Sequence, residues 1–220
     1  MKKKKIVALL CAAMMLCSCA YPMEGTVVVE AASITQTDSN GVTWEYEVVT
    51  ATDGNYAKIT NIKLQAGTTK VNIPSKLGSY TVKEIGSAYS DTTLFYQNKE
   101  LTTVSIPSTV TSIGFKAFYQ CTALEKVTFA SENSKKRVLT VGSCAFSGCS
   151  RLKEVKFPDG LAKLEINSQA FDGCQNLGIS EFNCVTSIGK DAFHNCDFTN
   201  VVFKEDVSIN GRAFGKAFKE

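Results

Sequence analysis

The sequence has little of what catalysis, metal binding and nucleotide binding require. Its 220 residues include one histidine, one tryptophan and four prolines. Neither of the glycine-rich loops that cradle phosphates, GxGxxG and GxxxxGKS/T, occurs in it. We therefore expect no nucleotide ligand and no cofactor.

An excess of charge of one sign is also lacking. The 24 basic and 21 acidic residues include four lysines and two glutamates within residues 1–32, so that 20 basic and 19 acidic residues remain after residue 32. Proteins that bind nucleic acid or an anionic membrane through their charge carry a clear excess of lysine and arginine. The near-neutral balance favours neither partner.

Long apolar runs are missing after residue 32, and no LPxTG-type wall-sorting pattern occurs. At the N-terminus, four lysines precede the apolar segment 6–16, which is too short to cross a bilayer as a helix. This order is typical of a secretory signal peptide. We predict that residues 1–32 are such a signal and that the protein is secreted or held at the cell surface.

The cleavage site of this signal has two candidates. Residues 16–19, Leu-Cys-Ser-Cys, resemble a lipobox, in which Cys19 would be lipidated and would tie the protein to a membrane. Residues 29–31, Val-Glu-Ala, form a small-residue site for ordinary signal peptidase, which would cut after Ala31 or Ala32. The first alternative gives a lipoprotein and the second gives a protein without a lipid anchor.

Ala-Phe pairs dominate the remaining sequence. Five of them follow one another at spacings of 28, 25, 22 and 21 residues, within the range of leucine-rich repeats. The pairs are Ala117-Phe118, Ala145-Phe146, Ala170-Phe171, Ala192-Phe193 and Ala213-Phe214. Leu94-Phe95 matches the same pattern in a degraded copy. We expect stacked coils whose Phe side chains form a ladder in the core.

Five positions before each of these Phe residues stands an aliphatic residue, and Gly or Asn comes directly after it. The Gly and Asn positions are Gly114, Gly142, Asn167, Gly189 and Asn210. Gly and Asn tolerate a positive φ at the least cost. We therefore predict a left-handed corner at this position, once per coil.

Short alternating segments complete the repeat, at residues 101–106, 124–129 and 152–157. In each segment, Val and then Ile or Phe point to one side, while Thr, Ser, Lys or Glu point to the other. This period of two predicts a half-buried strand. The sequence therefore predicts a β-rich solenoid over residues 67–220, a right-handed coil with one strand per repeat and about five to six coils.

Residues 33–66 lack the repeat and have a different pattern. Residues 44–48 alternate, Asp53-Gly54 supplies a turn, and residues 57–64 alternate again, which predicts a β-hairpin. A solenoid needs its open ends covered. We predict that residues 33–66 form an N-terminal β cap.

The repeat resembles that of a known family. Residues 101–123, LTTVSIPSTVTSIGFKAFYQCTA, are similar throughout to the consensus of the BspA-like leucine-rich repeats of bacterial surface proteins. The resemblance covers roughly residues 56–218. It implies a secreted or surface-exposed protein, and some family members resemble adhesins that bind matrix proteins or host cells. It brings no catalytic motif, and this chain lacks the long repeat arrays of larger members.

Cysteine is abundant, with nine residues, of which three lie within residues 1–32. Cys121, Cys149, Cys174 and Cys196 occupy one repeat position, three residues after the Phe, where other copies have Asn98 and Ala217. A position filled by Cys, Asn or Ala requires a small side chain, which favours a buried ladder of free cysteines. One or more disulfides between neighbouring coils remain the alternative. Cys144 and Cys184 lie off the ladder and are the better candidates for reactivity.

The only histidine, His194, gives no clear catalytic or metal site. Its repeat position is filled by Tyr119, Ser147 and Asp172 in other copies, which favours solvent exposure. A zinc site needs closely spaced ligands, and no complete CxxC set is present. We expect neither a bound metal nor enzymatic activity.

The outward side chains of the predicted strands are the candidate binding face. They are Thr103, Ser105, Lys126, Thr128, Glu154, Lys156, Glu181 and Asn200. The face is polar and without aromatic rings, so a protein ligand on host or neighbouring cells suits it better than a glycan. A structural cell-surface component without a specific ligand is the alternative.

Two inserted loops are the rival contact surface, because loops often carry function. They comprise residues 87–92 and 131–137. The second contains the basic run Lys135-Lys136-Arg137, which we interpret as a solvated loop tip.

Overall fold

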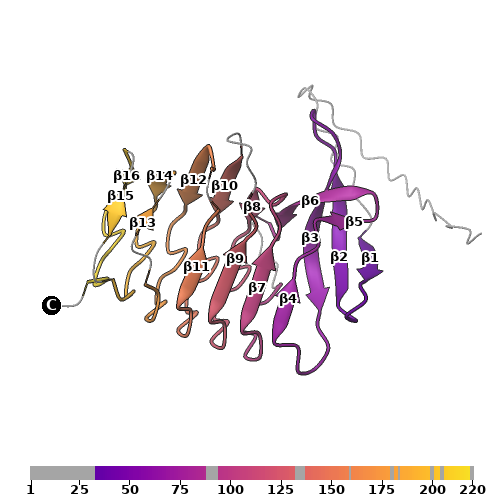
Figure 1. Ribbon diagram of the computed structural model, residues 1–220, viewed down its shortest axis with the longest axis horizontal. Helices are drawn as coiled ribbons and strands as arrows, with labels where there is room; N and C mark the ends of the chain where they lie inside the picture. Colours follow the sequence, from indigo (N-terminus) through magenta and orange to yellow (C-terminus); the bar gives the residue numbers. More distant parts are fainter. Residues whose placement is uncertain are drawn as a thin grey trace, which may run out of the picture. The chain divides into compact units, whose positions relative to one another are not determined.

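The structure is a computed structural model, and it describes residues 33–220 except 88–93, 132–136, 159, 179–180, 183, 199–200, 204–205 and 219–220. The predicted signal peptide with Cys19, the cleavage sites, Asn200, Lys135 and Lys136 therefore lie outside the described residues, as does nearly all of the loop 87–92. Every regular element in the described part of the chain is a β-strand. Figure 1 shows these strands following one another in sequence order.

The larger sheet has ten strands in the order β1-β2-β3-β6-β8-β10-β12-β14-β16, with β5 paired to β6. Its strands are β1 (Ile34–Thr37), β2 (Thr43–Val49), β3 (Tyr56–Lys63), β5 (Lys76–Leu77), β6 (Tyr80–Ile85), β8 (Ser112–Ile113), β10 (Val138–Val141), β12 (Lys163–Ile166), β14 (Val185–Ile188) and β16 (Ser208–Ile209). From β3 onward, the neighbours in this order are parallel.

The second sheet has four parallel strands in the order β11-β9-β7-β4, and a separate pair joins β13 to β15. These strands are β4 (Lys70–Asn72), β7 (Thr103–Ile106), β9 (Lys126–Phe129), β11 (Glu154–Lys156), β13 (Glu181–Phe182) and β15 (Val202–Phe203). Strands β7, β9 and β11 are those that the alternating segments predict, and the β-solenoid is confirmed. One detail is wrong: each coil contributes two strands, not one.

The second strand of each coil is the segment that ends in the aliphatic residue before Gly or Asn. The predicted left-handed corner is absent at Gly114, Gly142 and Gly189, whose φ is not positive. Instead, a Cβ at Gly142 would lie 2.5 Å from the carbonyl oxygen of Ile113 in the preceding coil. Glycine occurs at position 142 because the backbones of two neighbouring coils approach closely there and leave no room for a side chain.

Left-handed residues do recur, but at two other positions of the coil. One position directly precedes the Ala-Phe pair, and it is occupied by Lys116, Cys144, Gln169, Asp191 and Arg212, with φ between 53° and 58°. The other lies two residues after the Phe, where Gln97, Gln120, Gly148, Gly173, Asn195 and Lys216 are found. Most of these residues carry side chains, so the usual glycine signal does not mark these turns.

The Phe ladder is confirmed as the centre of the core. Successive rings stack nearly parallel, with centroid distances of 4.6 to 5.3 Å from Phe95 through Phe118, Phe146, Phe171 and Phe193 to Phe214. The four rings from Phe118 to Phe193 have no solvent exposure. Burying a Phe side chain contributes roughly 1.5–3 kcal/mol, so this column is a principal source of stability.

The cysteine ladder is also confirmed as buried and free. Cys121, Cys149, Cys174 and Cys196 are buried, and none of these four forms a disulfide. Each ladder thiol donates to the carbonyl oxygen of the Phe in the preceding coil, at 2.8 to 3.2 Å. Burial raises the pKa of Cys196 to about 12 and holds the pKa of Cys149 and Cys174 well above their ordinary value.

The expected hairpin is formed by β2 and β3, which are antiparallel, and β1 pairs antiparallel with the outer side of β2. Strand β3 then pairs parallel with β6, so the hairpin continues the larger sheet. Trp44 is buried, and its Nε1 donates to Oδ2 of Asp38 at 3.0 Å. The indole therefore covers the first coil with its polar atom satisfied.

Candidate interaction surfaces

The register of the second sheet brings six of the predicted face residues together. One column aligns Lys70, Thr103, Lys126 and Glu154, and the other aligns Asn72, Ser105, Thr128 and Lys156. We call these eight residues the strand face. Its Lys and Glu side chains and Asn72 are exposed, and its three hydroxyl residues are half-buried.

Lys70 and Asn72 are members that the sequence prediction did not include. They flank Val71 on β4, in a short strand that lacks the leucine start of the later repeats. The sequence signal that could have found them is the alternation of polar Lys70, apolar Val71 and polar Asn72. In the structure these residues are exposed, buried and exposed.

Glu181 is a predicted member of the face that the described strand pairing does not align with these eight residues. Glu181 lies on β13, which pairs with β15 and not with β11, so the four-stranded sheet ends at Glu154–Lys156. Asn200 lies outside the described residues. Glu181 thus lies in a separate strand pair, and its membership of a binding face stays a prediction.

One ion pair crosses the strand face. Nζ of Lys126 lies 2.8 Å from Oε1 of Glu154, and both side chains are about half exposed. A surface pair of this kind contributes about 0–1 kcal/mol to stability. These charges are therefore available to a partner at little cost to the fold, and with Lys70 and Lys156 the face carries three positive charges and one negative charge.

Arg137 does not belong to a solvated loop tip, and that interpretation is wrong for this residue. It is only 8% exposed, and its Nε and Nη2 donate to the carbonyl oxygen of Val110 at 3.0 and 2.7 Å. Nη1 reaches the carbonyl oxygen of Ala130 at 3.4 Å. The guanidinium thus satisfies backbone acceptors between neighbouring coils and is structural.

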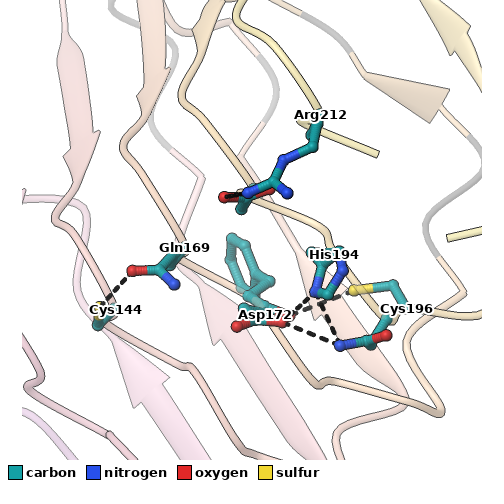
Figure 2. A network of polar contacts seen from close by, with 9 residues as sticks. Cys144, Gln169, Asp172, His194, Cys196 and Arg212 are labelled. Carbon is teal, nitrogen blue, oxygen red and sulfur yellow. Dashed lines mark hydrogen bonds and ion pairs between the residues drawn. The ribbon is translucent and has the colours of Figure 1, made fainter. Parts of the chain in front are cut away.

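His194 is half-buried, which differs from the expected solvent exposure. Figure 2 shows the ring of His194 beside Asp172. Its Nδ1 lies 3.1 Å from Oδ1 of Asp172 and 2.8 Å from Nδ2 of Asn195. The thiol of Cys196 donates to the carbonyl oxygen of Phe171, and this bond holds it in the ladder. His194 is thus part of a polar network across neighbouring turns.

The cysteines off the ladder are half-buried. The Sγ of Cys144 lies 3.7 Å from Oε1 of Gln169 (Figure 2), and burial raises the pKa of the Cys144 thiol. Because the thiolate is the reactive form of cysteine, this environment does not activate Cys144. Among the described residues, no three His, Cys, Asp or Glu side chains are grouped as metal ligands would be.

These features define a class of protein: a β-solenoid of leucine-rich repeats with an antiparallel cap. The model of the BspA type leucine rich repeat region matches residues 90–219 in six copies. The chain belongs to this family. In the described residues, no helix has the length and hydropathy needed to span a membrane.

Two solved structures resemble this chain. A leucine rich cell surface protein from Faecalibacterium prausnitzii is 30% identical, with a TM-score of 0.59, and the match covers 85% of this chain and 47% of that one. A leucine-rich repeat protein from Bacteroides ovatus is 28% identical, with a TM-score of 0.50 and coverage of 70% and 39%. The chain thus spans less than half the length of each. No curated protein matches the sequence.

Proposed function

We propose that the protein is exported and acts at the cell surface as an interaction module that binds a protein partner through the strand face. The aligned columns carry this proposal, because they place Lys70, Lys126, Glu154 and Lys156 at fixed positions on a rigid sheet. The printed description of the F. prausnitzii protein as a cell surface protein supports the location.

The chemistry of the face suits a protein ligand. Threonine and serine hydroxyls alternate with lysine and glutamate side chains, and the face has no aromatic ring on which a sugar could stack. A preformed face loses little conformational freedom when a partner binds, which lowers the cost of association. Lys126 and Glu154 fix each other's position and offer both signs of charge to the partner.

The test is surface plasmon resonance with the immobilised protein, residues 33–220, and a panel of purified extracellular matrix proteins. We expect one or more to bind and the triple variant Lys126→Ala, Glu154→Ala, Lys156→Ala to lose about tenfold or more in affinity. The matched control is Lys163→Ala with Glu165→Ala, which removes another Lys–Glu pair, at 2.7 Å, from β12 of the other sheet. Equal losses in both variants, or no binding at all, would contradict the proposal.

A structural cell-surface component without a specific ligand is the second candidate. Under this alternative, neither variant changes the affinity for any matrix protein in the surface plasmon resonance panel. The intact mass of the exported protein decides its attachment separately, because a chain that begins with lipidated Cys19 excludes cleavage after Ala31.

A further inference from the structure

A pocket of about 480 Å³ lies on the turns that follow Phe171, Phe193 and Phe214. Its volume falls within the range of about 300–1,000 Å³ that is usual for small-ligand sites. Six side chains provide its functional groups: Gln175, Asn176, Asn195, Asp197, Lys216 and Phe218. None of them belongs to the strand face.

Three successive coils contribute to this pocket from equivalent positions. Gln175, Asp197 and Phe218 each directly follow the small residue of the ladder. In the two coils before them, the same position holds Thr122 and Ser150. The carboxamide, the carboxylate and the phenyl ring are therefore a local departure from the repeat. The ring of Phe218 also packs beside those of Phe198 and Phe214, at centroid distances of 6.2 and 6.0 Å.

The protein orients two of the amides. Nδ2 of Asn176 donates to the carbonyl oxygen of Ser150 at 2.6 Å. Nδ2 of Asn195 lies 2.8 Å from Nδ1 of His194 and 3.5 Å from Oδ1 of Asp172. An amide whose nitrogen is engaged by the protein leaves its carbonyl oxygen for a ligand. With the amide of Gln175, the pocket is thus rich in acceptors and suits a ligand with several hydroxyl donors.

The charges and the apolar surface of the pocket lining restrict the class of ligand further. Lys216 and Asp197 carry opposite charges, so the lining gives no preference for an ion of either sign. The ring of Phe218 is 49% exposed although it is large and apolar. The C–H face of a pyranose ring packs against such a ring while its hydroxyl groups bind amides and carboxylates.

We propose that this pocket binds a neutral saccharide, at a site separate from the strand face. The proposal does not depend on a protein ligand of that face. Hydroxyl groups of the sugar donate to the amide oxygens of Gln175, Asn176 and Asn195, Lys216 donates to the sugar, and Phe218 covers its apolar side.

The test is a microarray of immobilised neutral oligosaccharides, which includes glucans, mannans, galactans and xylans, together with acidic polysaccharides. Residues 33–220 are the probe, and isothermal titration with the best soluble oligosaccharide gives the affinity. We expect saturable binding to at least one neutral class. Gln175→Ala and Phe218→Ala are each expected to weaken it about tenfold or more. Gln175 is an exposed side chain, so its removal leaves the fold intact even if Phe218→Ala does not.

The control variant is Tyr96→Ala, which removes another exposed aromatic ring from the turn side of an earlier coil. It should bind the oligosaccharide as the unchanged protein does. Three outcomes would overturn the proposal. They are no binding to any neutral glycan, binding to acidic polysaccharides alone, and binding that Gln175→Ala leaves unchanged.

Discussion

The thiol of Cys174 donates a hydrogen bond to the backbone carbonyl oxygen of Phe146 in the preceding coil, at 3.2 Å. The residue is completely buried, and the same bond recurs at the other three ladder cysteines. Cysteine at this position therefore has two roles, because it is small enough for the turn and it also satisfies a carbonyl group between coils. Asn98 in the degraded copy works differently, since its Oδ1 accepts from the backbone of Glu100 and Leu101.

Substitution of Cys174 tests both roles. Cys174→Ala keeps the small volume but removes the donor, so we expect the free energy of unfolding to fall by about 1 kcal/mol. Cys174→Leu overfills the turn and should cost about 1–3 kcal/mol. Urea denaturation followed by circular dichroism measures both. The same two substitutions at half-buried Cys144 are the control, and they should change stability less. If Cys174→Leu is as stable as the unchanged protein, the turn is not tightly packed.

The buried thiols also predict how stability depends on pH. The pKa of Cys196 is raised by burial to about 12, well above the ordinary value of a cysteine thiol. A raised pKa means that the folded state holds its proton while the unfolded chain releases it, so stability is complete below pH 9 and falls as pH rises above it. The free energy of unfolding from urea titrations should therefore be lower at pH 10.5 than at pH 8.

The control for this pH dependence is the variant in which Cys149, Cys174 and Cys196 are replaced by alanine. It lacks the three thiols whose pKa values burial raises. Its stability should change less between the two pH values. An unchanged pH profile would mean that these thiols do not cause the loss.

Much of this fold follows from the sequence, for physical reasons that particular residues show. Phe118 and Val104 recur at fixed positions because every coil buries the same points against its neighbours, so both the ladder and the strand columns were predictable. Gly142 was misinterpreted because glycine marks either a positive φ or a close backbone contact, and only the neighbouring coil distinguishes them. The separate pairing of β13 with β15 was not predictable, because strand pairing depends on the path of the backbone between coils.

The pocket of Gln175 and Phe218 had no sequence signal of its own. Its members are single departures from a repeat, and each alone is an ordinary exposed side chain. Arg137 was assigned to the surface for a similar reason, since a basic residue in a basic run is usually solvated. Only the position of the Val110 carbonyl group shows why its guanidinium is buried.

Glycine substitutions separate the two explanations for the glycines of the repeat. Gly142→Ala places a methyl group 2.5 Å from the carbonyl oxygen of Ile113, and we expect it to cost about 1–3 kcal/mol. Gly178→Ala is the matched control, because nothing lies within 4 Å of its Cβ position. Its effect should stay within about 0.5 kcal/mol. If thermal or urea unfolding shows equal stability for the two variants, the close-contact explanation fails.

Removal of the Arg137 side chain tests its structural role. Arg137→Ala leaves the carbonyl oxygen of Val110 without its two guanidinium donors, so stability should fall by about 1–3 kcal/mol. Exposed Lys163→Ala, which breaks a surface ion pair, should change it by no more than about 1 kcal/mol. A loss at Arg137 no larger than that at Lys163 would restore the view of a solvated side chain.

The central claim, that the strand face is the binding surface, is tested most directly by lysine footprinting. The protein is acetylated with and without the matrix protein that binds it in the surface plasmon resonance panel, and mass spectrometry gives the modification of each lysine. We predict protection of Lys70, Lys126 and Lys156, with no change at Lys163 on the other sheet. Protection of Lys163 while the three strand-face lysines remain fully modified would contradict the claim.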